Sequence, residues 1–223
     1  MTEAILIGRP NILAKVKCKS ITLGNSEILF MNVVKNLGVQ IDCHLSFDSR
    51  VNNIIRGVYM KIRRISKIRC FISEDIAILL MTSLVLTKLD YCYSRLANIT
   101  KDKLKALQVA QNDAARLVFR KKRNTSASDL LKELHWLPVC KRIQYKICTI
   151  VHKSIHSESP DYINELIHQY SPTRNLRSQK DSHILARPKT HRKVGEQSFT
   201  FSAPQFWNSL TEVFIVWMRS NRF

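Results

Sequence analysis

The chain has 223 residues, of which 45% are hydrophobic, so it is long enough to bury a core and too apolar to be disordered throughout. It carries 36 Lys and Arg residues against 17 Asp and Glu residues, a formal net charge of +19. Such a balance predicts a polyanionic partner, with nucleic acid ahead of an anionic membrane surface.

The sequence predicts neither a membrane span nor a secretory leader. The longest apolar run, residues 76–86, contains Thr82 and Ser83 and falls far short of the roughly 20 residues that a span requires. The six cysteines are scattered without the spacing of a disulfide framework, so we expect them to be reduced. We therefore expect an intracellular protein of the nucleus, the cytoplasm or both, with no membrane partner and no secretion.

A small β portion is predicted for residues 1–48. Two short apolar segments flank Gly24-Asn25 and predict a hairpin. Residues 35–42 predict one further strand, because apolar and polar residues alternate along it. Its apolar residues are expected to share one buried face: Leu37, Val39 and Ile41.

From Asp48 onward the apolar pattern has the period of a helix. The first predicted helix carries one apolar stripe at three- and four-residue steps: Val51, Ile54, Ile55, Val58, Ile62 and Ile65. Ser73 predicts the N-cap of a second helix, whose body, residues 76–86, is apolar nearly all round and is expected at the centre of a bundle. Thr100 is expected to cap a third helix that ends in a basic cluster.

Residues 124–223 predict a helical and irregular basic region. A short helix is expected through Leu134 and another from Pro138, with weaker patterns and several prolines after about Ser157. Trp136 and Trp207 are interpreted as buried anchors rather than as base-stacking residues. The fold class is therefore predicted as mainly α with a small N-terminal β portion, in three parts: residues 1–48, 49–123 and 124–223.

An ordered set of short strings resembles the reverse transcriptases of non-LTR retrotransposons, especially the jockey-like group. The strings are LGVQID at 37–42 with LSF at 45–47, LDYC at 89–92, LQVAQNDAAR at 107–116, LHWLPV at 134–139, NLRS at 175–178 and APQFWNSL at 203–210. The first pair resembles the end of the palm, and the next two resemble the helical thumb. The resemblance thus implies a palm-sheet remnant, a thumb-like helical bundle over residues 49–123, and a segment beyond the thumb.

The family copies RNA into DNA with two metal ions held by carboxylates, including an adjacent Asp-Asp pair. This sequence contains no Asp-Asp dipeptide, and the resemblance implies that the chain begins partway through the palm. We therefore predict no catalytic residue, no metal site, no cofactor (the Mg²⁺ of the family belongs to a site absent here) and no DNA synthesis by the chain alone. After Leu210 the sequence departs from the family, as a truncated or frame-altered copy would.

Three basic residues of the first predicted helix, Arg56, Arg63 and Lys67, lie seven and four positions apart and share one face. In the resemblance this helix belongs to a thumb, which lies along the primer–template duplex, so these residues are predicted to track phosphates. The alternative is a solvated basic face. Lys35 is predicted to contact primer phosphates, with an ordinary palm strand as the alternative.

Two further basic clusters are candidates for nucleic-acid contacts. Arg120, Lys121, Lys122 and Arg123 predict either a phosphate-binding corner or a nuclear localisation patch. Arg174 and Arg177 belong to a C-terminal basic tract that either clamps RNA or is a flexible tail. Cys148, His152 and His156 lie four apart on one predicted helix, but no Cys-x-x-Cys accompanies them, and zinc binding is not predicted.

The sequence thus predicts a nucleic-acid-binding C-terminal fragment of an RNA-directed DNA polymerase, which grips RNA, an RNA–DNA hybrid or DNA through phosphates. The missing palm and fingers portion of the polymerase is a further expected partner. The alternative is a domesticated or relic fragment that acts as a protein-interaction module, because an exposed strand edge is a ready pairing surface.

Overall fold

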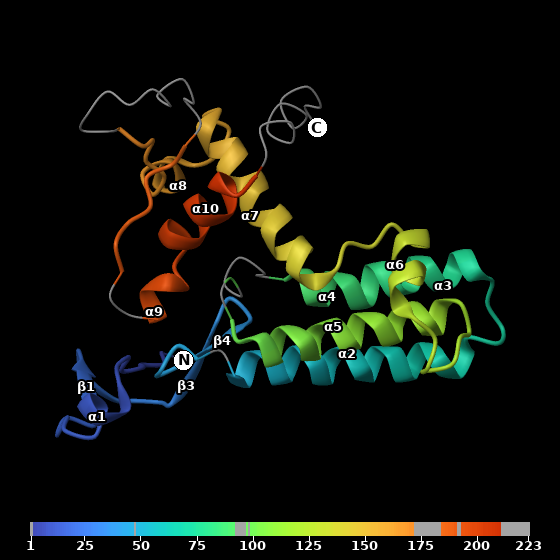
Figure 1. Ribbon diagram of the computed structural model, residues 1–223. Coiled ribbons are helices and arrows are strands. Elements are labelled where there is room, and N and C mark those ends of the chain that lie inside the picture. The colour runs from blue at the N-terminus through green and yellow to red at the C-terminus, as the bar shows by residue number, and fades with distance from the viewer. Residues whose placement is uncertain are drawn as a thin grey trace. The chain divides into compact units, whose positions relative to one another are not determined.

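The structure is a computed structural model that describes residues 2–46, 48–91, 97, 99–171, 184–190 and 193–210. It is mostly helical with a small β portion near the N-terminus, which confirms the predicted fold class at this level (Figure 1). The chain divides into two compact units, residues 1–91 with 109–130 and residues 92–108 with 131–223. The β portion and the first helices therefore belong to one unit.

The first hairpin of the first unit is confirmed. Strands β1 (Ser20–Leu23) and β2 (Ser26–Leu29) pair antiparallel around the two-residue turn Gly24-Asn25. Gly24 has a φ of 60°, which suits the first position of a type II′ turn, where a side chain would be strained.

The second predicted strand is wrong, because residues 35–42 turn back on themselves. Strands β3 (Val33–Asn36) and β4 (Val39–Asp42) form an antiparallel hairpin, with Leu37 at φ 48° and Gly38 at φ 78° in the turn. These are the dihedrals of a type I′ turn. Leu37 is 85% exposed instead of buried. The sequence did not reveal the turn, because the alternation of apolar and polar residues continues through its two residues.

An N-terminal segment ties the two hairpins together. The Ala4 carbonyl accepts a hydrogen bond from the amide of Met31 at 2.8 Å, and the Gly8 amide donates to the Cys43 carbonyl at 3.0 Å. A single helical turn, α1 (Pro10–Leu13), follows. No hydrophobic residue among residues 2–46 is fully buried, so this region is held mainly by backbone pairing.

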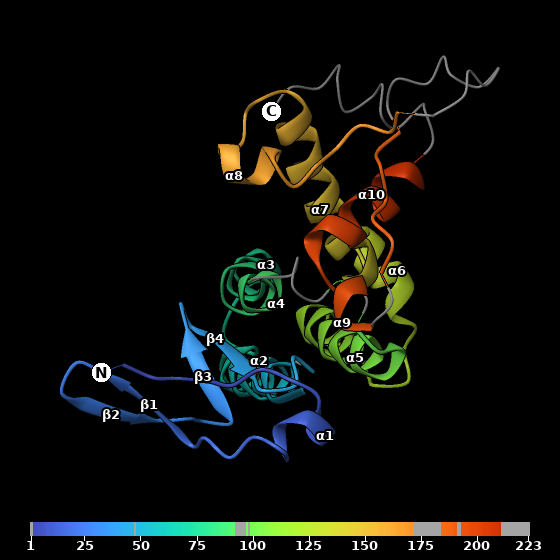
Figure 2. The same ribbon diagram turned by 90° about the vertical axis from the view of Figure 1, so that its left-hand side faces the viewer.

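Helix α2 (Asp48–Ile68) begins at Asp48, as predicted. Its stripe is confirmed in its core, since Val51, Ile54, Val58 and Ile65 are buried. Beside α2 runs a second rod of three joined segments, α3 (Glu74–Leu80), the π-helical η1 (Met81–Leu86) and α4 (Thr87–Asp90) (Figures 1 and 2). The Ser73 hydroxyl accepts from the Ile76 amide, which confirms the predicted N-cap.

The second rod is not buried all round, which contradicts its expected central position. Met81, Val85 and Leu89 are fully buried, whereas Leu79 and Leu84 are exposed. Apolar composition shows that a helix can be buried but not how many sides its neighbours cover. The π-helical hydrogen bonds of η1 were also not predicted; such wide turns are frequent at functional sites.

Helix α5 (Lys101–Val118) begins in the second unit and ends in the first, where α6 (Ala127–Glu133) begins. In the first unit, the C-terminal ends of α2 and α5 are joined by two arginines. Arg69, 5% exposed, donates from Nε to the carbonyls of Leu117 and Val118 at 3.2 and 3.1 Å, and from Nη2 to Val118. In return Arg120 donates to the Arg69 carbonyl at 2.9 Å. Each guanidinium thus donates to backbone carbonyls at the C-terminal end of the other helix.

The second unit contains α7 (Val139–Ile155), α8 (Asp161–Asn164), α9 (Lys193–Glu196) and α10 (Phe199–Asn208). Its core includes Ile147 and Val151 of α7 and Trp207 of α10, and Trp136 is also buried, so both tryptophans are anchors as predicted. The Asn208 side chain accepts from the Leu185 amide and donates to its carbonyl, both at 2.9 Å. Nowhere in the described parts of the chain is a helix both long and apolar enough to cross a bilayer.

Candidate nucleic-acid interface

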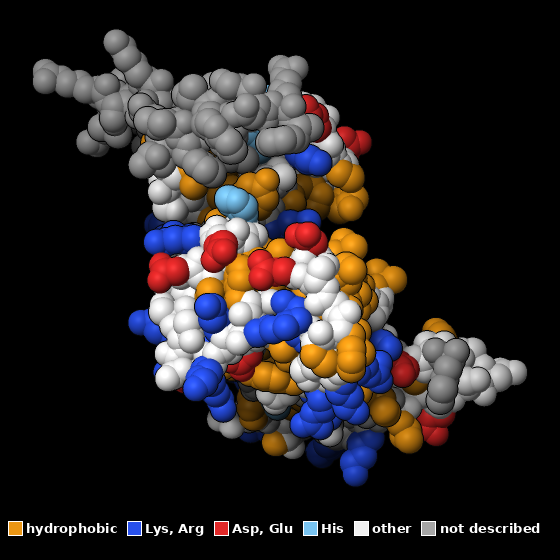
Figure 3. Space-filling model, turned by 90° about the vertical axis from the view of Figure 1, so that its right-hand side faces the viewer, with side chains coloured by type: hydrophobic (Ala, Val, Ile, Leu, Met, Phe, Trp, Pro, Cys, Tyr) orange, Lys and Arg blue, Asp and Glu red, His pale blue; other side chains and the backbone are white. Residues whose placement is uncertain are grey.

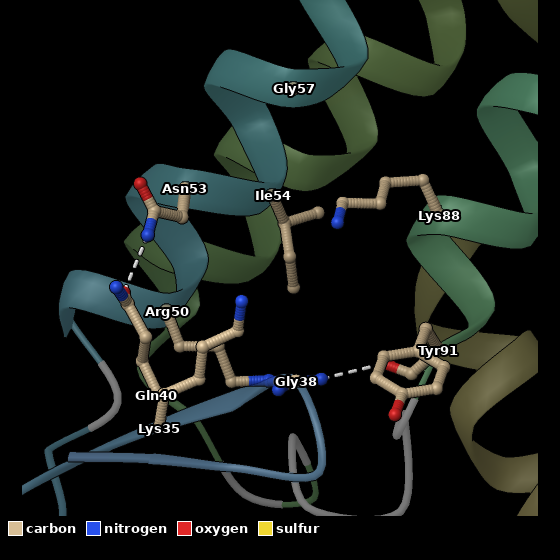
Figure 4. Close-up of a pocket in the computed structure, with 9 residues that line it drawn as sticks. All are labelled: Lys35, Gly38, Gln40, Arg50, Asn53, Ile54, Gly57, Lys88 and Tyr91. Atoms are coloured by element: carbon tan, nitrogen blue, oxygen red, sulfur yellow. Dashed lines mark hydrogen bonds between the residues drawn. The ribbon is translucent and has the colours of Figure 1, made fainter. Parts of the chain in front are cut away.

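The β3–β4 hairpin, α2 and α4 enclose a pocket of about 260 Å³ in the first unit (Figure 4). Its lining residues are Lys35, Gly38, Gln40, Arg50, Asn53, Ile54, Gly57, Lys88 and Tyr91. Lys35 was predicted from the sequence, and the structure brings it together with two further cationic residues, Arg50 and Lys88. No acidic side chain lies among these lining residues.

Arg50 is the most unusual residue of the pocket, because it is charged and only 4% exposed. Its Nη2 donates to the Tyr91 carbonyl at 2.6 Å. Its Nε is buried and has no hydrogen-bond partner in the described part of the chain. A buried cation without a carboxylate is costly, and a bound anion would remove that cost. The pocket is therefore suited to an anion.

Lys88 reaches into the pocket from α4 and is directed toward α2 (Figure 4). It passes close to Gly57, where an added Cβ would lie 3.6 Å from the Lys88 Cε. One helical turn after Gly57, Lys61 of α2 donates to the Leu84 carbonyl in η1 at 2.5 Å. Burial lowers the pKa of Lys61, and the nearby charge of Lys88 lowers it further, so the cations here repel one another in the absence of an anion.

Two hydrogen bonds connect the hairpin to the helices around the pocket. The Asn53 amide donates to the Gln40 side-chain carbonyl at 2.5 Å, and the Tyr91 hydroxyl donates to the Leu37 carbonyl at 2.5 Å. Tyr91 is 47% exposed and its side chain stands beside Gly38, whose added Cβ would lie 3.6 Å from the Tyr91 hydroxyl oxygen. The turn at Leu37-Gly38 is thus fixed against the end of the second rod.

A basic face runs along α2 from the pocket. After the pocket residue Asn53, exposed side chains follow at three- and four-residue steps: Arg56, Met60, Arg63 and Lys67. The 14 positions from Asn53 to Lys67 span roughly 21 Å at 1.5 Å per residue. The whole helix carries six Lys and Arg residues against one Asp, so this face meets little opposing charge. Figure 3 shows Lys and Arg side chains, with hydrophobic ones among them, gathered on the lower part of the face in view.

The structure therefore bears out the shared, exposed face of Arg56, Arg63 and Lys67, while their contact with phosphates stays a prediction. Sequence reasoning missed Arg50 and Lys88. A signal for Arg50 was present, since it precedes Ile54 by four positions and Val58 by eight and so falls on the apolar side of α2. Nothing in the sequence indicated Lys88, because only the packing of α4 beside α2 brings it to the pocket.

The predicted cluster at residues 120–123 is divided in the structure. Arg120 has a φ of 52° in the turn that ends α5, and its guanidinium donates to the Arg69 carbonyl while the residue as a whole is exposed, so its contact with phosphates stays a prediction. Lys121, Lys122 and Arg123 are exposed. Arg174 and Arg177 lie outside the described residues.

The remaining candidates for chemistry have structural surroundings. The Asp42 carboxylate accepts from the Ser46 amide at 2.9 Å at the end of β4, as expected for a residue that ends a strand. Burial raises the pKa of the Cys148 thiol to about 11, and the rings of His152 and His156 stack with centroids 4.3 Å apart. In the described residues no group of three or more His, Cys, Asp or Glu side chains is placed to hold a metal ion. The pocket and the basic face of α2 therefore remain the candidate site.

No protein-family model, curated protein or solved structure matches this chain. The relation to reverse transcriptases therefore stays a prediction that rests on the short sequence motifs alone.

Proposed function

We propose that the chain binds nucleic acid through backbone phosphates, as the thumb-bearing C-terminal fragment of a retrotransposon-type reverse transcriptase. An RNA–DNA hybrid is the proposed ligand. The fragment holds the duplex without catalysing DNA synthesis, because the carboxylates of the family's reaction are missing from its sequence.

The observation that carries the proposal is the continuity of positive charge from the pocket onto α2. Lys35, Arg50 and Lys88 line a pocket without an acidic residue, and α2, which forms one of its walls, continues as the basic face. A strand whose phosphate enters the pocket can place later phosphates beside Arg56, Arg63 and Lys67. The length of the face, roughly 21 Å at 1.5 Å per residue, accommodates several phosphates of one strand.

Such a surface recognises the backbone of a nucleic acid rather than its sequence. Lys and Arg side chains that meet phosphates displace condensed counterions, so affinity falls steeply as salt rises. They carry no information on base identity. We therefore expect similar affinity for hybrids of different sequence at a given salt concentration.

Fluorescence anisotropy of the full chain with a labelled RNA–DNA hybrid, titrated with salt, tests the proposal. Heparin of matched total charge serves as the control polyanion. We expect the hybrid to bind more tightly than heparin, with a linear fall of log affinity against log salt. Equal affinity for the hybrid and for heparin would mean that the chain binds any polyanion through its net positive charge, and would overturn the proposal.

A matched pair of triple variants locates the interface. R56Q/R63Q/K67Q removes three charges from the α2 face, and K141Q/K146Q/K153Q removes three exposed charges from α7. We expect the α2 variant to lower the salt slope by about 2.7, because each phosphate that the protein no longer neutralises lowers the slope by about 0.9. The α7 variant should leave the slope nearly unchanged. Equal decreases in both variants would contradict an interface on α2.

A second candidate function is supported by the first hairpin. Ile21, Leu23 and Leu29 of β1 and β2 are all at least half exposed, with Ile21 and Leu23 on one face of the hairpin and Leu29 on the other. They would suit a protein-interaction module that pairs with another strand-bearing chain. Association that persists at high salt and disappears in a Leu23→Lys, Leu29→Lys variant would favour this alternative over nucleic-acid binding.

A further inference from the structure

We infer that the pocket binds the phosphomonoester at the end of a nucleic-acid strand, in preference to an internal phosphodiester. The inference rests on the proposed function, since it names the part of the nucleic acid that the pocket takes. It gives the pocket and the α2 face different roles, with the pocket fixing an end and the face following the strand.

The first argument is charge. Lys35, Arg50 and Lys88 place three positive groups around one hollow that has no acidic lining residue. A phosphomonoester carries a charge of about −1.5 to −2 at pH 7, whereas each internal diester carries one negative charge. The dianion therefore gains more from the three cations than a diester does.

The second argument is the unused donor of Arg50. Its Nη2 is bound to the Tyr91 carbonyl, while its Nε is buried without a partner in the described part of the chain. A monoester has three terminal oxygens that can accept hydrogen bonds, one more than the two free oxygens of a diester. The extra acceptor allows Arg50, Lys35 and Lys88 each to contact the same group.

The third argument is shape. The pocket is bounded by the β3–β4 hairpin on one side and by α2 and α4 on the others, with Ile54 and Gly57 in its wall (Figure 4). An internal phosphate carries a nucleoside on each side and is better suited to an open surface such as the α2 face. A terminal phosphate carries one nucleoside and can enter a hollow while the strand leaves by the mouth.

Tyr91 supplies a place for the terminal nucleoside. Tyr91 is 47% exposed, and its hydroxyl is held by the Leu37 carbonyl, so the side chain is fixed while the residue stays partly accessible. Bases stack on aromatic rings with little dependence on sequence. The pocket thus combines a phosphate-binding hollow with an aromatic side chain in its lining, as a strand end requires.

Three hybrid duplexes of one sequence test the inference, one ending in a 5′-phosphate, one in a 3′-phosphate and one in hydroxyl groups only. We expect one phosphate-ended duplex to bind the full chain about tenfold more tightly than the hydroxyl-ended one, the effect of a charge-assisted hydrogen bond. Lys88→Gln should lower affinity for all three and bring the ratio close to one. The control Lys141→Gln, on α7, should leave the ratio unchanged.

The outcomes separate the inference from the function on which it rests. Equal affinities for the three duplexes, all above the heparin control, would overturn the inference and leave the proposed function standing. Affinities no better than heparin would overturn both. A preference for a phosphate end that survives in Lys88→Gln would also overturn the inference, because the preference would then come from another surface.

Competition with a free nucleotide distinguishes the two sources of a phosphomonoester. Adenosine monophosphate is added to the complex with the preferred duplex, and adenosine is the control. Displacement by the monophosphate alone supports the inference and shows that a free nucleotide satisfies the pocket. Retention of the duplex, together with the tenfold preference, supports it and assigns the pocket to strand ends.

Discussion

The two parts of the first unit are built differently, although they meet at one pocket. In the β portion, residues 2–46, no hydrophobic side chain is fully buried, and the hairpins are held by backbone pairing. In the helical part, Val58, Met81, Val85 and Leu89 have no exposed surface. Apolar burial stabilises the helices, whereas a two-stranded hairpin has marginal stability on its own.

The difference bears directly on the candidate site. Arg50, Lys88 and the α2 face are positioned by the well-packed helices, but Lys35 and the Leu37-Gly38 turn belong to the weakly packed hairpin. The Asn53–Gln40 and Tyr91–Leu37 hydrogen bonds link this hairpin to the helices. Binding should therefore depend on the order of the hairpin as well as on charge, because an opened hairpin removes one wall of the pocket.

The largest expected difference between the two parts comes from one substitution made in each. Leu89→Ala removes a fully buried side chain from α4, and Leu29→Ala removes one that is 65% exposed on β2. We expect the first to lower the free energy of unfolding by about 2–5 kcal/mol and the second by about 0.5 kcal/mol or less. Urea unfolding of both variants measures this. Similar decreases would show that the β portion is as well packed as the helices.

The arginine pair at the ends of α2 and α5 gives the next largest effect. Arg69→Ala removes a nearly buried guanidinium that donates to three carbonyl groups, those of Leu117, Val118 and Ile72. We expect the free energy of unfolding to fall by about 2–3 kcal/mol, since the buried Val118 carbonyl loses both of its Arg69 donors and the other two carbonyls lose one donor each. Arg63→Ala, which removes an equal charge from an exposed position of α2, should cost about 0.5 kcal/mol or less. Equal decreases in the two variants would mean that the loss of a positive charge, and not the loss of hydrogen bonds to carbonyls, lowers the free energy of unfolding.

The sequence predicted those features that depend on neighbours along the chain. The α2 stripe, the Ser73 cap and the first hairpin are all specified by local patterns, and each was found. The second hairpin was missed because Leu37, an uncommon residue at positive φ, occupies a turn position where Asn or Gly gives a clear signal. The π-helical turn of η1 likewise has no known local signature in its six residues.

The candidate site was predicted only where it lies on one regular element. Arg56, Arg63 and Lys67 could be grouped because helical spacing alone places them on one face of α2. Lys35, Arg50 and Lys88 come from three elements, and only packing brings them together. Arg120 is exposed like the lysines that follow it, and its bond to the Arg69 carbonyl depends on the meeting of two distant helix ends.

Removing one hydroxyl group tests the link between hairpin and helices. Tyr91→Phe deletes the hydrogen bond to the Leu37 carbonyl and leaves the ring. We expect the β3–β4 amides to exchange faster with solvent by up to about tenfold, because a hydrogen bond contributes about 0.5–1.5 kcal/mol. Hydrogen–deuterium exchange of the full chain measures the effect.

Tyr59→Phe is the matched control for this prediction. It deletes the hydrogen bond from a tyrosine hydroxyl to the Asp113 carboxylate, which joins α2 to α5 at 3.0 Å. The β3–β4 amides should exchange at the original rate in this variant. Faster exchange of the hairpin in both variants would show that it opens together with the helices, and the contrast between the two parts would fail.

The smallest expected effect would strengthen the hairpin. Leu37 has a φ of 48° and an 85% exposed side chain, so Leu37→Asn removes strain without removing a buried side chain and creates the Asn-Gly pair preferred in type I′ turns. We expect slower exchange of the β3–β4 amides, by about two- to fivefold for a gain of about 0.5–1 kcal/mol.

Leu23→Asn is the control for this prediction. It makes the same replacement at an exposed position of strand β1, where Asn is disfavoured, and should not slow the exchange of the β1–β2 amides. Since Lys35 is carried by the stabilised hairpin, Leu37→Asn should also tighten binding of the phosphate-ended hybrid slightly. Unchanged exchange in this variant would mean that the turn is already held by Tyr91, and that the two parts of the unit are more strongly coupled than their packing indicates.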